Sequence, residues 1–116
     1  MSNKVVQNNN YPRVVIGVDA TPVTPNVNTT DILVLTTLSQ STTIANPVGN
    51  PQNLQSLEIR ITSASSEPLA WGSAYQGSSQ LPLPTATTGG GLTDYYGFKY
   101  DTLNSKWDFL ASAPGL

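Results

Sequence analysis

Hydrophobic residues along the chain occur in short runs that suit β-strands, and few follow the spacing of an amphipathic helix. The segment 56–62 alternates cleanly, with aliphatic residues on one face and Glu58 and Arg60 on the other. The segment 31–38 is apolar at both odd and even positions, which predicts a strand covered on both faces. Short β-branched sequence predicts a further strand at 13–18.

Near the end of the chain, the segments 93–100 and 106–112 predict a hairpin around the turn 101–105. Alternation places two sets of side chains on one face of each strand: Tyr96, Phe98 and Tyr100 on the first, and Trp107, Phe109 and Ala111 on the second. Weaker strand candidates lie at 68–71 and 80–83, and two prolines restrict the latter to a sheet edge.

Helix signals are almost absent, because nine Pro and nine Gly are spread along the 116 residues. Many short strands with turn signals between them predict an all-β fold, either a small antiparallel β-sandwich or a barrel. The pattern does not choose between those two arrangements.

The first 30 residues differ from the rest, because Pro22 and Pro25 among polar residues keep this segment out of a central sheet. We therefore predict an extended N-terminal arm at 1–30 and a β-domain at 31–116. Such an arm buries little against its own domain. Either it has no fixed structure, or it gains order on another subunit through an apolar patch formed by Val14, Val15, Ile16 and Val18.

Composition excludes several kinds of chemistry. The chain has no Cys and no His, which rules out disulfides, histidine-based nucleophile systems and histidine-bearing zinc sites. Its five cationic residues are scattered, so we expect no nucleic-acid partner. The longest apolar run, 32–35, is far too short to span a membrane. No secretory signal is visible, so we expect synthesis in the cytoplasm.

Seven carboxylates remain as candidate chemistry. Two of them at a suitable spacing could hydrolyse a glycosidic bond, and Asp101, Asn104 and Asp108 offer oxygen ligands suited to calcium. Turn and surface roles explain these residues better, because Asp and Asn are common in hairpin turns and Glu58 lies at an outward position. We therefore predict a protein that is not an enzyme and holds neither metal nor cofactor.

The aromatic residues are the remaining candidates for function. We assign them to the core or to a subunit interface: Trp71, Tyr75, Tyr96, Phe98, Tyr100, Trp107 and Phe109. An alternative is that Trp71, Tyr75 and Trp107 stack on sugar rings at a receptor-binding surface.

Five short stretches carry a resemblance to a known type of protein: Ile44-Ala45-Asn46-Pro47, Leu57-Glu58-Ile59-Arg60-Ile61, Leu69-Ala70-Trp71-Gly72-Ser73-Ala74-Tyr75, Tyr96-Gly97-Phe98-Lys99-Tyr100 and Ser105-Lys106-Trp107-Asp108. In this order they resemble a small β-module of tailed-bacteriophage structural proteins, found in tail-fibre or head-associated chains. The Leu-x-Trp-Gly-x-x-Tyr segment and the Ser-Lys-Trp-Asp ending carry most of the resemblance, which covers residues 30–112.

The resemblance implies a structural protein of a virion, with no catalytic residues. A short module with an arm suits a capsid decoration, or cement, protein on the virion surface. Such a protein bridges neighbouring subunits of the major capsid protein, and we expect it to be a homo-oligomer. The alternative is the tip of a tail fibre that recognises a glycan on the host surface.

Overall fold

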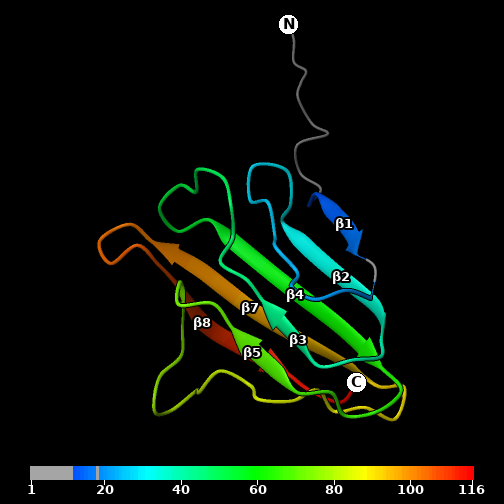
Figure 1. The fold of residues 1–116 in the computed structure, drawn as a ribbon. Helices are drawn as coiled ribbons and strands as arrows, with labels where there is room; N and C mark the ends of the chain where they lie inside the picture. The colour runs from blue at the N-terminus through cyan, green and yellow to red at the C-terminus, as the bar shows by residue number, and fades with distance from the viewer. Residues whose placement is uncertain (1–11, 18) are drawn as a thin grey trace, which may run out of the picture.

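The computed structural model describes residues 12–17 and 19–116, which form eight strands and no helix (Figure 1). The strands are β1 (Val14–Gly17), β2 (Ile32–Leu38), β3 (Thr42–Ile44), β4 (Ser56–Ser63), β5 (Leu69–Trp71), β6 (Tyr75–Gln76), β7 (Thr93–Asp101) and β8 (Lys106–Ala113). This confirms the predicted all-β class. Within the described residues, no helix is present that could cross a membrane.

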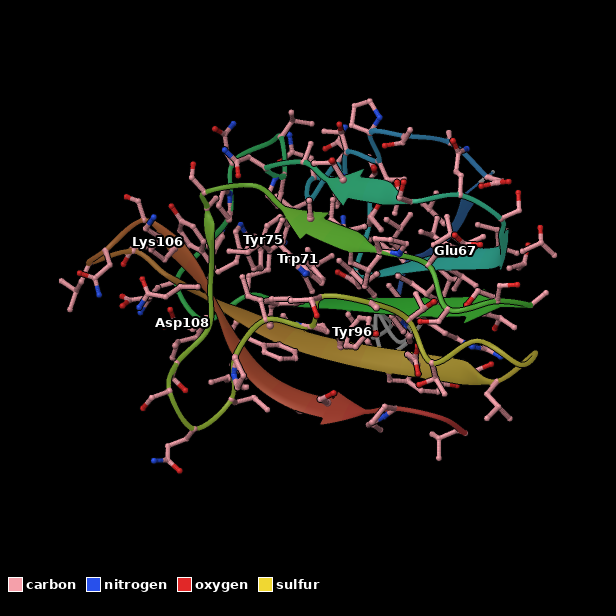
Figure 2. All side chains as sticks on the ribbon, turned by 60° about the horizontal axis from the view of Figure 1, so that its bottom comes forward. Glu67, Trp71, Tyr75, Tyr96, Lys106 and Asp108 are labelled. Carbon is pink, nitrogen blue, oxygen red and sulfur yellow. The ribbon has the colours of Figure 1, made fainter. Side chains whose placement is uncertain are left out.

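The strands form two layers. A six-stranded sheet has the order β1-β2-β4-β7-β8-β6, and β3 pairs with β5 in a small second sheet above it (Figure 2). Only the β4–β7 and β7–β8 pairs are antiparallel, whereas β1–β2, β2–β4, β3–β5 and β6–β8 are parallel. The predicted antiparallel pairing is therefore wrong for the sheet as a whole. The chain leaves β2, crosses through β3 in the other layer and returns to start β4 beside the start of β2, which makes that pair parallel.

The hydrophobic core lies between the two layers. The predicted alternation of β4 is confirmed, because Leu57, Ile59 and Ile61 are all at most 1% exposed and face β3 and β5. The core continues through further buried residues from other segments: Val27, Leu33, Leu35, Leu38, Ile44, Leu69, Tyr75, Tyr96, Phe98, Trp107 and Phe109. These side chains attach the small sheet to one face of the large one.

The C-terminal hairpin forms as predicted, but its second strand contains a bulge. Tyr100 pairs with Trp107 and Phe98 pairs with Phe109, whereas Gly97 pairs with Ala111. Leu110 is the extra residue, and the bulge reverses the face on which the next side chains lie. Ala111 therefore does not share a face with Phe109, as simple alternation predicted, but lies on the opposite side of the sheet.

The predicted arm is largely part of the domain. β1 forms the edge of the large sheet beside β2, and Val23 forms an isolated bridge with Ile44. Val27 is 2% exposed in the core. The prediction that this segment buries little against its own domain is wrong for the described residues. Residues 1–11 and Val18, including one residue of the predicted contact patch, lie outside the described part.

Prolines explain how this segment packs without joining a sheet. Pro25 lacks an N–H group, yet its carbonyl accepts a hydrogen bond from Val48 N at 2.9 Å, and Val27 N donates to Val48 O at the same distance. The segment thus bonds to the 42–48 stretch at separate points and inserts its apolar side chains between them. Sequence periodicity does not reveal this mode of packing.

Three further strand positions differ between the prediction and the structure. The segment 80–83 begins with a bend and forms no strand, because the nearby prolines cannot supply ladder hydrogen bonds; Ser78 N donates to Leu81 O. β3 and β6 were not predicted, because strands of three and two residues are too short to show alternation.

Candidate functional site

Within the described part of the chain, only one face of the large sheet is covered by other elements, and we call its other side the outer face. Strand register places rows of residues across this face. One row is Val14, Ile32, Glu58, Gly97 and Ala111, and the next is Ile16, Val34, Arg60, Tyr95 and Ala113. Each row begins with aliphatic residues on β1 and β2 and ends with an alanine on β8. The outer face therefore combines aliphatic ends with a polar centre.

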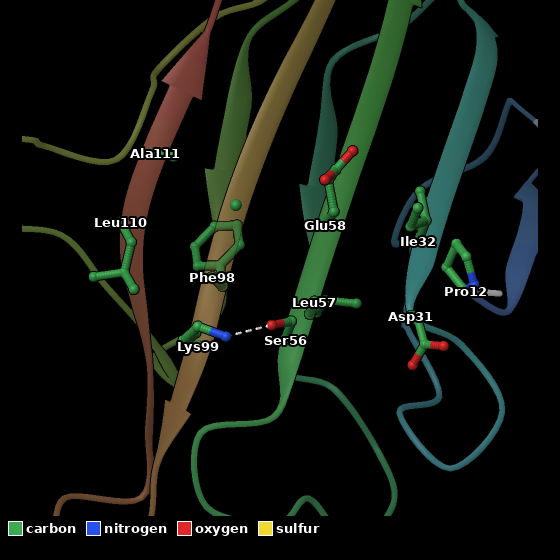
Figure 3. Close-up of a pocket in the computed structure, with 11 residues that line it drawn as sticks. Pro12, Asp31, Ile32, Ser56, Leu57, Glu58, Phe98, Lys99, Leu110 and Ala111 are labelled. Atoms are coloured by element: carbon green, nitrogen blue, oxygen red, sulfur yellow. Dashed lines mark hydrogen bonds between the residues drawn. The ribbon is translucent and has the colours of Figure 1, made fainter. Parts of the chain in front are cut away.

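A shallow groove of about 350 Å³ crosses this face from Pro12 and the start of β2 to β8 (Figure 3). Its floor is low because Gly97 has no side chain and Ala111 has a short one. Leu110, pushed outward by the bulge and 58% exposed, borders the β8 end. The remaining lining comes from Pro12, Asp31, Ile32, Ser56, Leu57, Glu58, Phe98 and Lys99.

Charged groups along the groove differ in how they are held. Asp31 accepts two hydrogen bonds from the side chain of Arg13, at 2.8 and 3.1 Å, and these bonds lower its pKa. Lys99 Nζ donates to Ser56 Oγ at 2.6 Å. Glu58 lies between them on the groove floor. Its carboxylate accepts no hydrogen bond from the other described residues of the outer face.

Arg60 and Tyr95, in the second row of outer-face residues, form a polar ridge beside the groove. The guanidinium of Arg60 lies over the ring of Tyr95, 5.5 Å from its centroid. This cation–π contact holds two long side chains together on the surface of adjacent strands β4 and β7. The ridge gives the outer face a fixed relief.

The β1 edge of the sheet carries further exposed apolar residues. Val14, Val15 and Ile16 are 52%, 40% and 67% exposed, although they belong to a strand. β1 pairs only with β2 among the described strands, and we call its other edge, which has no strand partner in residues 12–17 and 19–116, the open edge. Val14 and Ile16 project onto the outer face, which joins this edge to the groove.

The predicted aromatic residues gather between the layers instead. Trp71 makes edge contacts with Tyr75 and Tyr96 and packs against Phe98, at centroid distances of 5.2, 5.9 and 5.5 Å (Figure 2). The indole N–H of Trp71 donates to Pro84 O at 2.7 Å. Tyr100 and Trp107 pack at 5.0 Å, and Phe98 and Phe109 at 5.1 Å.

Tyr75 is 4% exposed, and its hydroxyl donates to Ala45 O at 2.9 Å. Burial raises its pKa above the ordinary value. Trp107 is 2% exposed. Two of the three rings considered for sugar stacking are therefore enclosed, and the third, Trp71, packs against Tyr75 and is only partly accessible.

The candidate calcium ligands lie in and after the C-terminal hairpin turn. Asp101 holds the hairpin turn, because its carboxylate accepts hydrogen bonds from Leu103 N and Asn104 Nδ2, both at 2.9 Å. Asp108 lies on β8, beyond that turn. Across residues 12–17 and 19–116, no three acidic side chains come close enough together to hold a metal ion.

Comparison of the chain with family models, curated proteins and solved structures found no match. Sequence reasoning identified the β1 patch but missed the groove. The signals that could have indicated it are a glycine within an otherwise bulky strand and two alanines at the end of β8.

Proposed function

We propose that the protein is a structural protein of a bacteriophage virion, and that it decorates the capsid by binding shell subunits through its outer face. The observation that carries this proposal is the uncovered sheet face, which has a groove and exposed Leu110, Val14 and Ile16. Exposed apolar side chains surrounded by ordered polar side chains are typical of protein–protein contact surfaces. The phage-module resemblance of residues 30–112 supports the same role.

Shape and rigidity also support a contact role. The described strands form two packed layers, a six-stranded sheet and a two-stranded sheet. Its outer face is a regular β-surface rather than a set of loops, so little conformational entropy is lost when a partner covers it. A rigid face that spans a junction can bind two neighbouring capsid subunits at once.

Affinity per copy need not be high. Burial of apolar surface contributes about 25 cal/mol per Å², and ordering costs reduce the net gain. Many copies that each bridge separate shell subunits stabilise the shell collectively, because contacts within one assembly act at a high effective concentration.

A pair of leucine variants tests the proposed surface. Leu110→Asp places a charge beside the groove, and we expect it to weaken binding to purified capsid shells at least tenfold, about 1.4 kcal/mol. Leu103→Asp is the matched control, because Leu103 is 93% exposed at the tip of the hairpin and away from the groove. Co-sedimentation with shells measures both. Equal binding by the two variants would exclude the outer face as the binding surface.

Copy number distinguishes this proposal from a tail-fibre tip. Quantitative mass spectrometry of purified virions should find hundreds of copies of a decoration protein. A few to a few dozen copies, together with saturable binding to intact host cells, would favour the tip instead. Absence from virions would contradict both.

A further inference from the structure

We propose that a second copy of this chain binds at the open edge of β1, so that two β1 strands pair antiparallel about a two-fold axis and join the large sheets into one. This deepens the proposed function, because it specifies how copies associate beside one another. The role of such a dimer on a capsid rests on the proposed function, whereas the pairing of the two β1 strands does not. The hydrogen-bonding groups, side chains and exposure of β1 favour this association.

The backbone of β1 has two residues directed outward. Ile32 N donates to Arg13 O at 3.1 Å, and the register then pairs Val15 with Leu33. In a parallel ladder, alternate residues direct both their N–H and C=O groups to the same neighbour. Arg13, Val15 and Gly17 therefore direct theirs to β2, whereas Val14 and Ile16 direct theirs to the open edge.

Two residues with this spacing are self-complementary. When β1 of a second copy runs antiparallel with Val15 at the two-fold axis, Val14 lies opposite Ile16 of the partner subunit. Each such pair exchanges two hydrogen bonds, because both residues direct N–H and C=O groups outward. All outward groups of Val14 and Ile16 on both strands are satisfied at once, without any shift of the β1–β2 ladder.

The side chains favour this pairing as well. Val14 and Ile16 lie on the same face as their counterparts across the axis, so they form one cluster beside Ile32 and Val34. No charged residue and no proline lies within 14–17 to prevent pairing, although such residues usually protect edge strands. The other edge of the large sheet, β6, has only two residues.

A second copy also gives this short edge a closed arrangement. Any antiparallel partner strand would form the same few hydrogen bonds with Val14 and Ile16. Isologous pairing instead closes as a dimer, since each copy uses its single β1 edge. The contact is small, so we expect a weak dimer with a dissociation constant of roughly 10 µM to 1 mM.

Amide hydrogen exchange and sedimentation of the full chain test the proposal. At low concentration, we expect the Val15 amide to be protected and the Ile16 amide to exchange freely. At concentrations above the dissociation constant, the Ile16 amide should become protected as sedimentation equilibrium detects dimer. An Ile16 amide that exchanges equally at both concentrations would overturn the pairing.

Two variants distinguish backbone pairing of β1 strands from non-specific hydrophobic association. Ile16→Pro removes the outward N–H, a position where edge strands accept proline, and we expect at least a tenfold loss of dimerisation. Ile16→Val keeps that N–H and the branched side chain, so its dimerisation should change less than threefold. Circular dichroism and exchange in β4 and β7 verify that both variants fold.

Dimerisation of Ile16→Pro at the wild-type level would overturn the proposal, as would a wild-type chain that remains monomeric at 1 mM. Either result leaves shell binding by the outer face intact. Conversely, a chain that dimerises through β1 and does not bind shells would overturn the proposed function alone.

Discussion

At the scale of single residues, the most constrained polar group is Asp94, which is fully buried beside the end of the large sheet. Its carboxylate accepts hydrogen bonds from Thr88 N at 2.8 Å, Thr88 Oγ1 at 2.6 Å and Gly115 N at 2.8 Å. Burial by itself would raise the pKa of Asp94, but the hydrogen bonds outweigh it and hold the pKa below the ordinary value. Asp94 on β7 thus holds two other segments: the loop that contains Thr88 and Gly89–Gly91, and the C-terminal residues around Gly115.

Replacement of this carboxylate should cost stability in a pH-dependent way. We expect Asp94→Asn to lower the free energy of unfolding at pH 7 by about 1–3 kcal/mol, because one amide N–H then faces a buried donor. A lowered pKa in the folded state stabilises the fold above the unfolded-state value near 3.9, and this contribution is lost as pH falls. Urea denaturation between pH 7 and pH 2 measures it.

The asparagine variant also serves as its own control for the pH effect. Its stability should depend less on pH below about 5 than that of the wild type, because the titrating group is gone. Parallel pH profiles for the two proteins would show that Asp94 does not contribute through its charge.

At the scale of elements, the segment before β2 behaves as part of the fold. β1 supplies the sheet edge, and Val27 fills a core position under the 42–48 stretch. Arg13 strengthens this attachment, because its guanidinium also donates to Asn28 O at 2.5 Å. A segment that prolines exclude from the central sheet still contributes buried apolar surface.

Deletion of residues 1–27 therefore should damage the domain itself. We expect a loss of at least 2 kcal/mol in the free energy of unfolding, because β2 loses its neighbour and the core loses the Val27 side chain. Chemical denaturation of the truncated chain measures the loss. Val27→Ala in the full chain is the matched control and should account for only part of this loss, about 1 kcal/mol. A truncated domain as stable as the full chain would show that this segment only rests on the surface.

At the scale of the whole molecule, the fold separates a packed side from an open one. The small β3–β5 sheet covers one face of the large sheet and encloses the aromatic cluster. The outer face is left with its groove, and β1 is left with an open edge. The proposed shell contact uses the face, and the proposed dimer uses the edge, so a single copy can make both contacts.

Filling the groove should separate the two contacts. The backbone of Gly97 is open to larger residues, because a Cβ atom there would meet Ala111 Cβ at an ordinary 3.6 Å. We expect Gly97→Leu to change the free energy of unfolding by less than about 1 kcal/mol, since strands accept such residues. It should weaken shell binding at least tenfold while dimerisation by sedimentation equilibrium stays within threefold of the wild type. Gly97→Ala is the control, and undiminished shell binding by the leucine variant would contradict a role for the groove.

Sequence reasoning was most accurate where a strand is long and one-sided. The alternation at 56–62 identified the buried face of β4, and the facing aromatics identified the β7–β8 hairpin. It was wrong about Ala111, because a bulge is a local change of register that alternation does not record. It also missed the short strands β3 and β6 and predicted a strand at 80–83 where none forms, because too few residues carry a pattern in these segments.

By itself, the sequence determined that this is an all-β protein with an apolar patch before residue 20 and a cluster of aromatics. These properties follow from spacing and residue type, which act locally. Only the tertiary structure decided that the aromatics are enclosed, that Val27 belongs to the core and that one sheet face and one edge stay open. Those outcomes depend on which segments the crossover through β3 brings together, and contacts between residues distant in the chain leave no local pattern.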